Sequence, residues 1–293
     1  MGRILVIADR KAPCVASSRG MALAQSLGYS VDVVAFAYAS LRRLGIPREQ
    51  QAGVKRSMLD RREKELREQI DATAPEGTRV GLRVVWMKDI APWIIGRTES
   101  RRYDLVIKTA HHSATASYTS TDWQLLRESA APVMILDGKH WHRERPVLAA
   151  LDLTTRSKAK RRLNREVLGQ AKTLADALGV SLSCISAVEI PELLADLDVL
   201  DPADFTRRVK SDMQPHLQEL SQAFSLPEKA FHCRRGGTAD VISREVKRLD
   251  AQLVVMGTVG RRGLRAKLLG NTAESVLQGL SADVLAIRPP GEK

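Results

Sequence analysis

The feature that most constrains the fold of this chain is an internal repeat. Apolar runs that would form strands, and helix ends marked by glycine, recur in the same order in both halves of the sequence. The corresponding segments are Ile4–Asp9 with Val147–Asp152, Leu23–Gly28 with Leu174–Gly179, Tyr103–Lys108 with Ala251–Met256, and Pro132–Leu136 with Asp283–Ile287. Self-similarity of this kind indicates one structural unit built twice. The chain is therefore predicted to be a tandem duplication.

Each half contains five strand-like segments separated by stretches of helical length. Strands that alternate with amphipathic helices are typical of α/β proteins with parallel sheets. We therefore expect two tandem Rossmann-like domains, each with a five-stranded, mainly parallel sheet flanked by helices. The polar, turn-rich segment 137–146 stands immediately before the second copy's first strand. The predicted domains are residues 1–143 and 144–293.

The net charge of +12 raises the question of a nucleic-acid partner. The excess is spread over both halves, and only 4% of the residues are aromatic. Nucleic-acid-binding modules usually combine a concentrated basic surface with aromatic side chains that stack on bases. The sequence therefore predicts no specific nucleic-acid binding, and only weak binding to DNA that disappears as salt rises.

The targeting and cysteine patterns are those expected of a cytoplasmic protein. No run approaches the roughly eighteen consecutive apolar residues that a membrane span needs. The N-terminal segment lacks the pattern of a signal peptide. Cys14, Cys184 and Cys233 are widely spaced, with no CxxC motif. We expect reduced thiols, a cytoplasmic location and no membrane span.

A basic loop that contains glycines lies in the second half, between a strand-like run and a helix-like segment. Glycines let the backbone approach an oxygen-rich group closely, and free N–H groups at a helix N-terminus favour a phosphate. The spacing is neither that of a P-loop nor that of a GxGxxG turn. The sequence nevertheless predicts an anion-binding site here. Its residues are Gly257, Gly260, Gly270, Asn271 and Thr272, with Arg261, Arg262, Arg265 and Lys267 in the loop.

Asp9 and Asp152 end the first strand of their respective halves. Ligands of open α/β sheets bind at the carboxyl ends of strands, where a carboxylate can accept hydrogen bonds from ribose hydroxyls. A cap for the following turn or helix is the alternative role, and both stay open. The basic run Arg156–Arg162, just after Asp152, either faces a polyphosphate or forms a solvated helix face.

The sequence contains no recognisable catalytic or metal-binding constellation. GxSxG and HExxH motifs are absent, as is a Ser-Lys or Cys-His pair with a supporting context. His111 and His112 would point to opposite faces of a strand, and His140 and His142 lie in a polar segment. We therefore predict no catalytic residues and no metal ligands.

The first half departs from the second at the loop. Thr109 and His112 stand where the second half has Gly257 and Gly260, and Thr121-Asp122-Trp123 stands where it has Gly270-Asn271-Thr272. A carboxylate at Asp122, close to a helix start, would repel a phosphate. The first half is therefore predicted not to bind a nucleotide phosphate in this manner.

The second half is similar to the universal stress protein family. Nucleotide-binding members of that family carry the pattern G-x2-G-x9-G-[S/T] after their fourth strand. Here the pattern reads Gly257-Thr258-Val259-Gly260, nine further residues, and Gly270-Asn271, so that Asn271 replaces Ser or Thr. The two copies cover essentially the whole chain, and one degenerate copy is typical of the family's tandem-domain type.

The resemblance implies an adenine nucleotide alpha hydrolase-like fold and a site for ATP in the second half, with Mg²⁺ bound only through the nucleotide. The implied roles are Asp152 near the ribose or adenine, the backbone of Ala187 and Val188 beside the base, Met256 and Gly257 under the ribose, and Gly260, Gly270, Asn271 and Thr272 on the phosphates. Family members also pair through their last strands. Val133–Leu136 and Val284–Ile287 would then form an intramolecular pseudo-dimer, and a further homodimer stays open.

The leading hypothesis is a stress-response regulatory protein that binds ATP or a related adenine nucleotide in its C-terminal domain, with little or no catalysis. The alternative is an interaction protein that holds a lipid-like or nucleotide-sugar ligand in the inter-domain or N-terminal crevice. An enzyme of nucleotide transfer is the third hypothesis.

Overall fold

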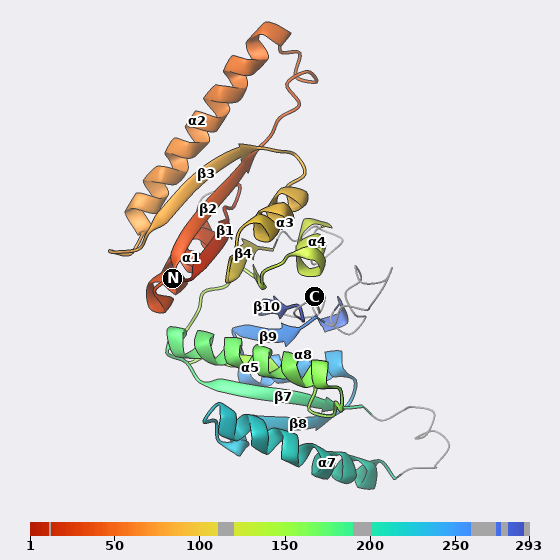
Figure 1. Cartoon of the computed structure of the whole chain (residues 1–293). Coiled ribbons are helices and arrows are strands. Elements are labelled where there is room, and N and C mark those ends of the chain that lie inside the picture. The colour runs from red at the N-terminus through yellow and green to blue at the C-terminus, as the bar shows by residue number, and fades with distance from the viewer. Residues whose placement is uncertain (12, 111–119, 190–200, 259–273, 277–280, 290–293) are drawn as a thin grey trace. The chain divides into compact units, whose positions relative to one another are not determined.

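Figure 1 shows the computed structural model of the chain. The structure describes all residues except 12, 111–119, 190–200, 259–273, 277–280 and 290–293. The chain divides into two compact units, Met1–Gly138 and Lys139–Lys293. The predicted functional domains, residues 1–143 and 144–293, stay a prediction.

The first unit alternates strands with helices along the chain. Its elements are β1 (Arg3–Ile7), α1 (Val15–Leu27), β2 (Ser30–Ala37), α2 (Arg48–Thr73), β3 (Val80–Trp86), α3 (Ala91–Ser100), β4 (Leu105–Thr109), α4 (Ser120–Glu128) and β5 (Val133–Leu136). The strands lie in the order β3-β2-β1-β4-β5, and neighbouring strands are parallel. Helices α1 and α2 contact each other. Helices α3 and α4 also pack together (Figure 1).

The second unit repeats this arrangement. Its elements are β6 (Val147–Ala150), α5 (Lys158–Leu178), β7 (Leu182–Val188), α7 (Pro202–Ala223), the 3-10 helix η1 (Glu228–Ala230), β8 (Phe231–Arg235), α8 (Thr238–Leu249), β9 (Leu253–Gly257) and β10 (Asp283–Ile287). The strands lie in the order β10-β9-β6-β7-β8 and are parallel. Strand β6 is therefore central, with β9 on one side and β7 on the other.

Glycines end the first helix of each unit, as the repeat predicts. Gly28 follows α1 and Gly179 follows α5, and both adopt the left-handed conformation with φ of 66°. Glycine reaches this region without the steric cost of a Cβ atom. The next N–H then turns back onto the helix, from Tyr29 to the Ala24 carbonyl and from Val180 to the Ala175 carbonyl. The same left-handed turn therefore links the first helix to the second strand in both units.

The core lies between the strands and the helices that cover them. Apolar side chains of the central strands are almost completely buried, including Ile4 and Val6 in β1 and Leu148 in β6. Strands that are buried on both faces are typical of parallel sheets covered by helices. The predicted fold class, α/β with mainly parallel five-stranded sheets, is confirmed. In the described part of the chain, no helix has the length and apolar character needed to cross a membrane.

Candidate functional site

The strand register of the second unit gathers several of the predicted site residues at one edge of the sheet. Ala150, the last residue of β6, lies beside Ile185 of β7 and Met256 of β9. Asp152 therefore emerges next to the ends of the strands that carry Ala187, Val188 and Gly257. Gly260, Gly270, Asn271 and Thr272 lie outside the described residues. The predicted roles of all nine residues stay predictions.

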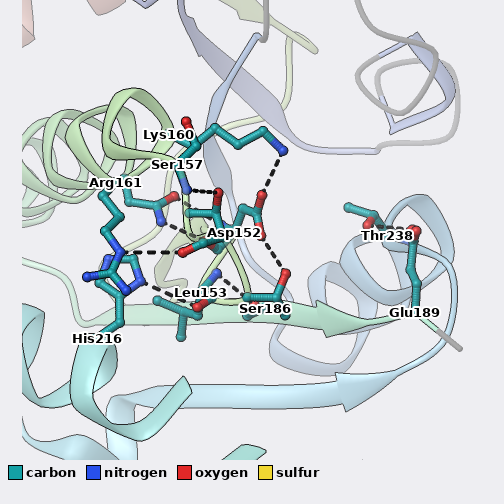
Figure 2. A network of polar contacts seen from close by, with 12 residues as sticks. Asp152, Leu153, Ser157, Lys160, Arg161, Ser186, Glu189, His216 and Thr238 are labelled. Atoms are coloured by element: carbon teal, nitrogen blue, oxygen red, sulfur yellow. Dashed lines mark hydrogen bonds and ion pairs between the residues drawn. The ribbon is translucent and has the colours of Figure 1, made fainter. Parts of the chain in front are cut away.

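Asp152 presents its carboxylate at this edge, held by two side chains (Figure 2). The Thr154 hydroxyl donates to Asp152 Oδ1 at 2.8 Å, and Lys160 Nζ lies 3.0 Å from Oδ2. The carboxylate is partly open to solvent, with 39% of the side chain exposed. A carboxylate has about four acceptor positions, so Asp152 can accept further hydrogen bonds from a ligand.

The backbone of the β6–α5 connection is fixed by buried polar side chains that the sequence analysis did not identify. Asn164 of α5 makes a reciprocal pair with Asp152: its Oδ1 accepts from the Asp152 N–H at 3.0 Å, and its Nδ2 donates to the Asp152 carbonyl at 2.8 Å. Ser186 of β7 accepts from the Leu153 N–H at 3.2 Å. Asn164 is a polar residue on the apolar face of α5, which is the sequence signal that could have revealed it.

Glu189, just beyond β7, is a second carboxylate that the sequence analysis missed. It accepts from the N–H and the hydroxyl of Thr238, the first residue of α8, at 2.8 and 2.7 Å (Figure 2). Carboxylates are stabilised at helix N-termini, where free N–H groups and the helix dipole favour negative charge. Glu189 therefore acts as a cap for α8. Glu189 belongs to none of the sequence motifs, so there was no reason to select it from the sequence.

The basic run Arg156–Arg162 leads into and includes the exposed first turn of α5, and it contacts several acceptors. Lys160 pairs with Asp152, and Arg161 Nε donates to the Thr155 carbonyl at 3.4 Å. Arg156 lies 4.0 Å from Asp212 of α7. The side chains of the run are exposed to solvent, and Lys160 reaches back to the strand edge, so both alternatives stay open.

Gly257 has a packing role that does not depend on a ligand. A Cβ atom at this position would lie 2.5 Å from Leu163 Cδ2 and 2.8 Å from Leu163 Cγ. Real carbon atoms do not approach so closely without a shift of one partner. Leu163 of α5 is buried. Glycine at 257 therefore lets α5 lie against the end of β9, which brings the start of that helix close to the strand edge.

The equivalent aspartate of the first unit serves a structural purpose. Asp9 Oδ2 accepts from the N–H of Ala16, in the first turn of α1, at 3.3 Å. The Asp9 N–H donates to Cys14 Sγ at 3.2 Å, and Arg62 of α2 donates to the Asp9 carbonyl. Asp9 thus caps α1, whereas the Asp152 carboxylate contacts Thr154 and Lys160. The two repeats keep the same residue in different roles.

A buried ion pair stands in the first unit at positions that the second unit fills with uncharged residues. Lys108 of β4 lies 2.6 Å from Asp122 Oδ1 of α4, and the Asp122 side chain has no exposed surface. Lys108 Nζ also donates to the Thr109 carbonyl at 2.9 Å. The repeat aligns these residues with Met256 and Asn271. Asp122 therefore lies inside the unit and pairs with Lys108, and that it would repel a phosphate stays a prediction.

His216 lies beneath the β6–α5 connection and is expected to make the second unit sensitive to acid. It is 3% exposed, and its ring Nδ1 lies 3.4 Å from the Leu153 carbonyl (Figure 2). Burial lowers the pKa of His216 below its ordinary value, against the opposing effects of the Leu153 carbonyl, Glu219 and Asp152. Arg161 lowers it further. The neutral ring is therefore favoured in the folded state.

The unfolded state takes up this proton first, so stability falls as pH falls through the unfolded value of about 6.5 toward the lower folded value. A His216→Gln variant is expected to lose less stability between pH 8 and pH 5.5 than the wild type. Thermal unfolding at the two pH values measures the difference. His140→Gln, at an exposed position, is the control and should behave as the wild type. An unchanged acid sensitivity in His216→Gln would contradict the assignment.

Cysteines and histidines form no metal site in the described part of the chain. Cys14 and Cys184 are buried free thiols, and burial raises the pKa of Cys184 to about 12. His140 and His142 are exposed. His111 and His112 lie outside the described residues.

The fold is that of an α/β protein with parallel sheets, a class whose ligands usually bind at the carboxyl ends of the strands. The sequence model of the Universal stress protein family matches residues 145–288. The Universal stress protein E homolog of Haemophilus influenzae is 32% identical over 212 residues, which are 70% of this chain and 69% of that protein. The chain belongs to the universal stress protein family, and the predicted resemblance is confirmed.

Other relatives extend the likeness over more of the chain. Universal stress protein E of Salmonella typhi is 29% identical over 247 residues, 82% of this chain and 78% of that protein. A protein of unknown function from Pseudomonas aeruginosa PAO1 superimposes with a TM-score of 0.73 and 24% identity, covering 98% of this chain and 92% of that one. A universal stress protein from Archaeoglobus fulgidus superimposes with a TM-score of 0.64 and 18% identity. The match covers 99% of this chain and 98% of that one. These structures support the fold.

Proposed function

We propose that the chain is a stress-response regulatory protein that binds ATP or a related adenine nucleotide in its second unit, with little or no catalysis. The observation that carries the proposal is the position of Asp152. Its partly exposed carboxylate follows β6, which pairs with β9, the strand that leads into the glycine-bearing loop. A hydroxyl acceptor and a phosphate-binding loop at adjoining strand ends are what a nucleotide requires.

The chemistry of the neighbouring residues supports this assignment. Asp152 would accept ribose hydroxyls, and the β7 backbone at Ala187 and Val188 would lie beside the base. The Val188 side chain is buried, so only the main chain at that position is offered to a ligand, and its carbonyl already accepts from the Gly236 N–H at 3.1 Å. Met256 and Gly257 would lie under the ribose. Gly260, Gly270, Asn271 and Thr272 would bind the phosphates, with Mg²⁺ held through the nucleotide.

The first unit supports a single site per chain. Its strand-end carboxylate is used as a helix cap, and a buried ion pair replaces the uncharged residues of the second unit. We propose that this unit is the intramolecular partner of the nucleotide-binding unit, and that the protein acts in the cytoplasm.

A second candidate function rests on an aromatic cluster in the first unit. Phe36 and Trp93 meet edge to face at 5.4 Å, and Tyr38 and Trp86 lie 5.7 Å apart. Lys55 Nζ lies 5.8 Å from the centre of the Trp86 ring, and Tyr38 is 47% exposed. Aromatic surface at the carboxyl ends of β2 and β3 favours the alternative of a lipid-like or nucleotide-sugar ligand in the N-terminal crevice.

Calorimetric titration of ATP separates the two functions. The wild type is expected to bind ATP, and the Gly260→Asp, Gly270→Asp double variant is expected to lose binding because two carboxylates would face the phosphates. Asp152→Asn should weaken binding, whereas Asp9→Asn, at the matched position of the first unit, should not. A folded wild type that gives no heat with ATP would refute the nucleotide proposal. Tryptophan quenching by a non-nucleotide ligand would then support the second.

A further inference from the structure

We propose that Lys160 is a specificity-determining residue of the second unit's site, which selects phosphorylated nucleotides over nucleosides. Its ammonium pairs with Asp152 and would transfer to a phosphate when Asp152 accepts a ribose hydroxyl. The inference rests on the proposed function, because it concerns the same site. It adds a residue that lies outside the glycine-bearing loop.

The fold places Lys160 at the end of β6, on a helix that contacts both β6 and β9. It is the third residue of α5, and Leu163 lies one turn further along the same helix. Residues three apart on a helix share a face, and Leu163 is the residue that contacts Gly257 at the end of β9. Lys160 Nζ is also 3.0 Å from Asp152, beyond β6. The ammonium therefore lies at the end of β6, on the helix that packs against the end of β9.

The present contact of Lys160 is one that a ligand can replace. The Lys160 and Asp152 side chains are 46% and 39% exposed. An ion pair so open to water contributes little to stability, and its loss changes an equilibrium by no more than about fivefold. A polyphosphate carries more negative charge than one carboxylate, so the ammonium gains by moving to it. The lysine stem has enough free rotation for this shift.

Asp152 keeps its position when the lysine leaves. Its main chain is held on both sides by Asn164, and the Thr154 hydroxyl donates to Oδ1. Only Oδ2 faces the lysine. The carboxylate that accepts the ribose hydroxyl is therefore already oriented, and transfer of the ammonium opens one of its oxygens. A nucleoside without phosphate must compete with Lys160, whereas a nucleotide gives Lys160 a new partner.

The test compares adenosine with ATP in calorimetric titrations of the wild type and Lys160→Met. We expect the variant to bind ATP about tenfold more weakly, because a cation next to the phosphate is lost. We expect it to bind adenosine equally well or up to about fivefold more tightly, because the competitor for Asp152 is removed. Weaker binding of ATP without weaker binding of adenosine is the result that the proposal predicts.

Lys158→Met is the matched control, since Lys158 lies in the same exposed turn and makes no contact with Asp152 in the described structure. It should change ATP affinity less than twofold, as loss of general charge alone would. Equal weakening of both ligands by Lys160→Met, or an equal effect of Lys158→Met on ATP, would overturn the role of Lys160 while leaving nucleotide binding intact. A wild type that binds neither ligand would overturn the proposed function as well.

Discussion

Replacing Lys108 with methionine is expected to lower the free energy of unfolding of the first unit by about 3–5 kcal/mol, because it removes the ammonium group that pairs with a buried carboxylate. Lys108 lies 2.6 Å from Asp122 in a fully buried environment. The double variant Lys108→Met, Asp122→Asn installs the residues that the second unit has at the aligned positions, Met256 and Asn271. It should recover most of the loss, since an uncharged pair avoids the cost of burying two charges.

Urea unfolding followed by tryptophan fluorescence measures these changes. Three of the four tryptophans, Trp86, Trp93 and Trp123, belong to the first unit. Arg56→Met is the control, because Arg56 and Asp60 form an exposed pair at 4.0 Å and its loss should cost less than about 1 kcal/mol. A Lys108→Met variant as stable as the wild type would show that the ion pair does not hold the unit together.

Substitution of Gly257 by alanine is expected to destabilise the second unit by about 1–3 kcal/mol, the usual effect of inserting a methyl group into a close-packed contact. The new Cβ atom would lie 2.5 Å from Leu163 Cδ2. Leu163→Ala removes the obstructing atoms, so the double variant should be more stable than the sum of the two single losses predicts. Thermal unfolding of the four proteins measures this coupling.

Gly53→Ala is the control for Gly257→Ala. Gly53 lies within α2, and a Cβ atom added there would meet no atom within 4 Å. This substitution should be neutral or stabilising by up to about 1 kcal/mol. Strict additivity of Gly257→Ala and Leu163→Ala would contradict the packing role, and Gly257 would then need a ligand to explain it.

The repeat made the fold predictable because both copies obey the same local rules. Apolar runs ending in aspartate became β1 and β6, and Gly28 and Gly179 took the left-handed conformation that ends a helix. These features depend on neighbouring residues in the sequence, and local preference and global fold agree there.

The environment of each site residue was harder to predict, since it depends on partners distant in sequence. Asp9 and Asp152 are equivalent in the repeat, and only their contacts distinguish them. Asp9 accepts from the Ala16 N–H and caps a helix, whereas Asp152 pairs with Lys160 and stays partly exposed. The sequence placed Asp122 near a helix start correctly, but its partner is Lys108, fourteen residues earlier in the chain, and the pair is buried. Such pairings follow from packing, which sequence spacing does not encode.

The number of ATP molecules bound per chain tests the central claim most directly. Titration of the wild type should give one ATP per chain, and the same titration of the Gly260→Asp, Gly270→Asp variant should give none while the protein stays folded. Two ATP molecules per chain, or one that persists in the variant, would contradict a site confined to the second unit.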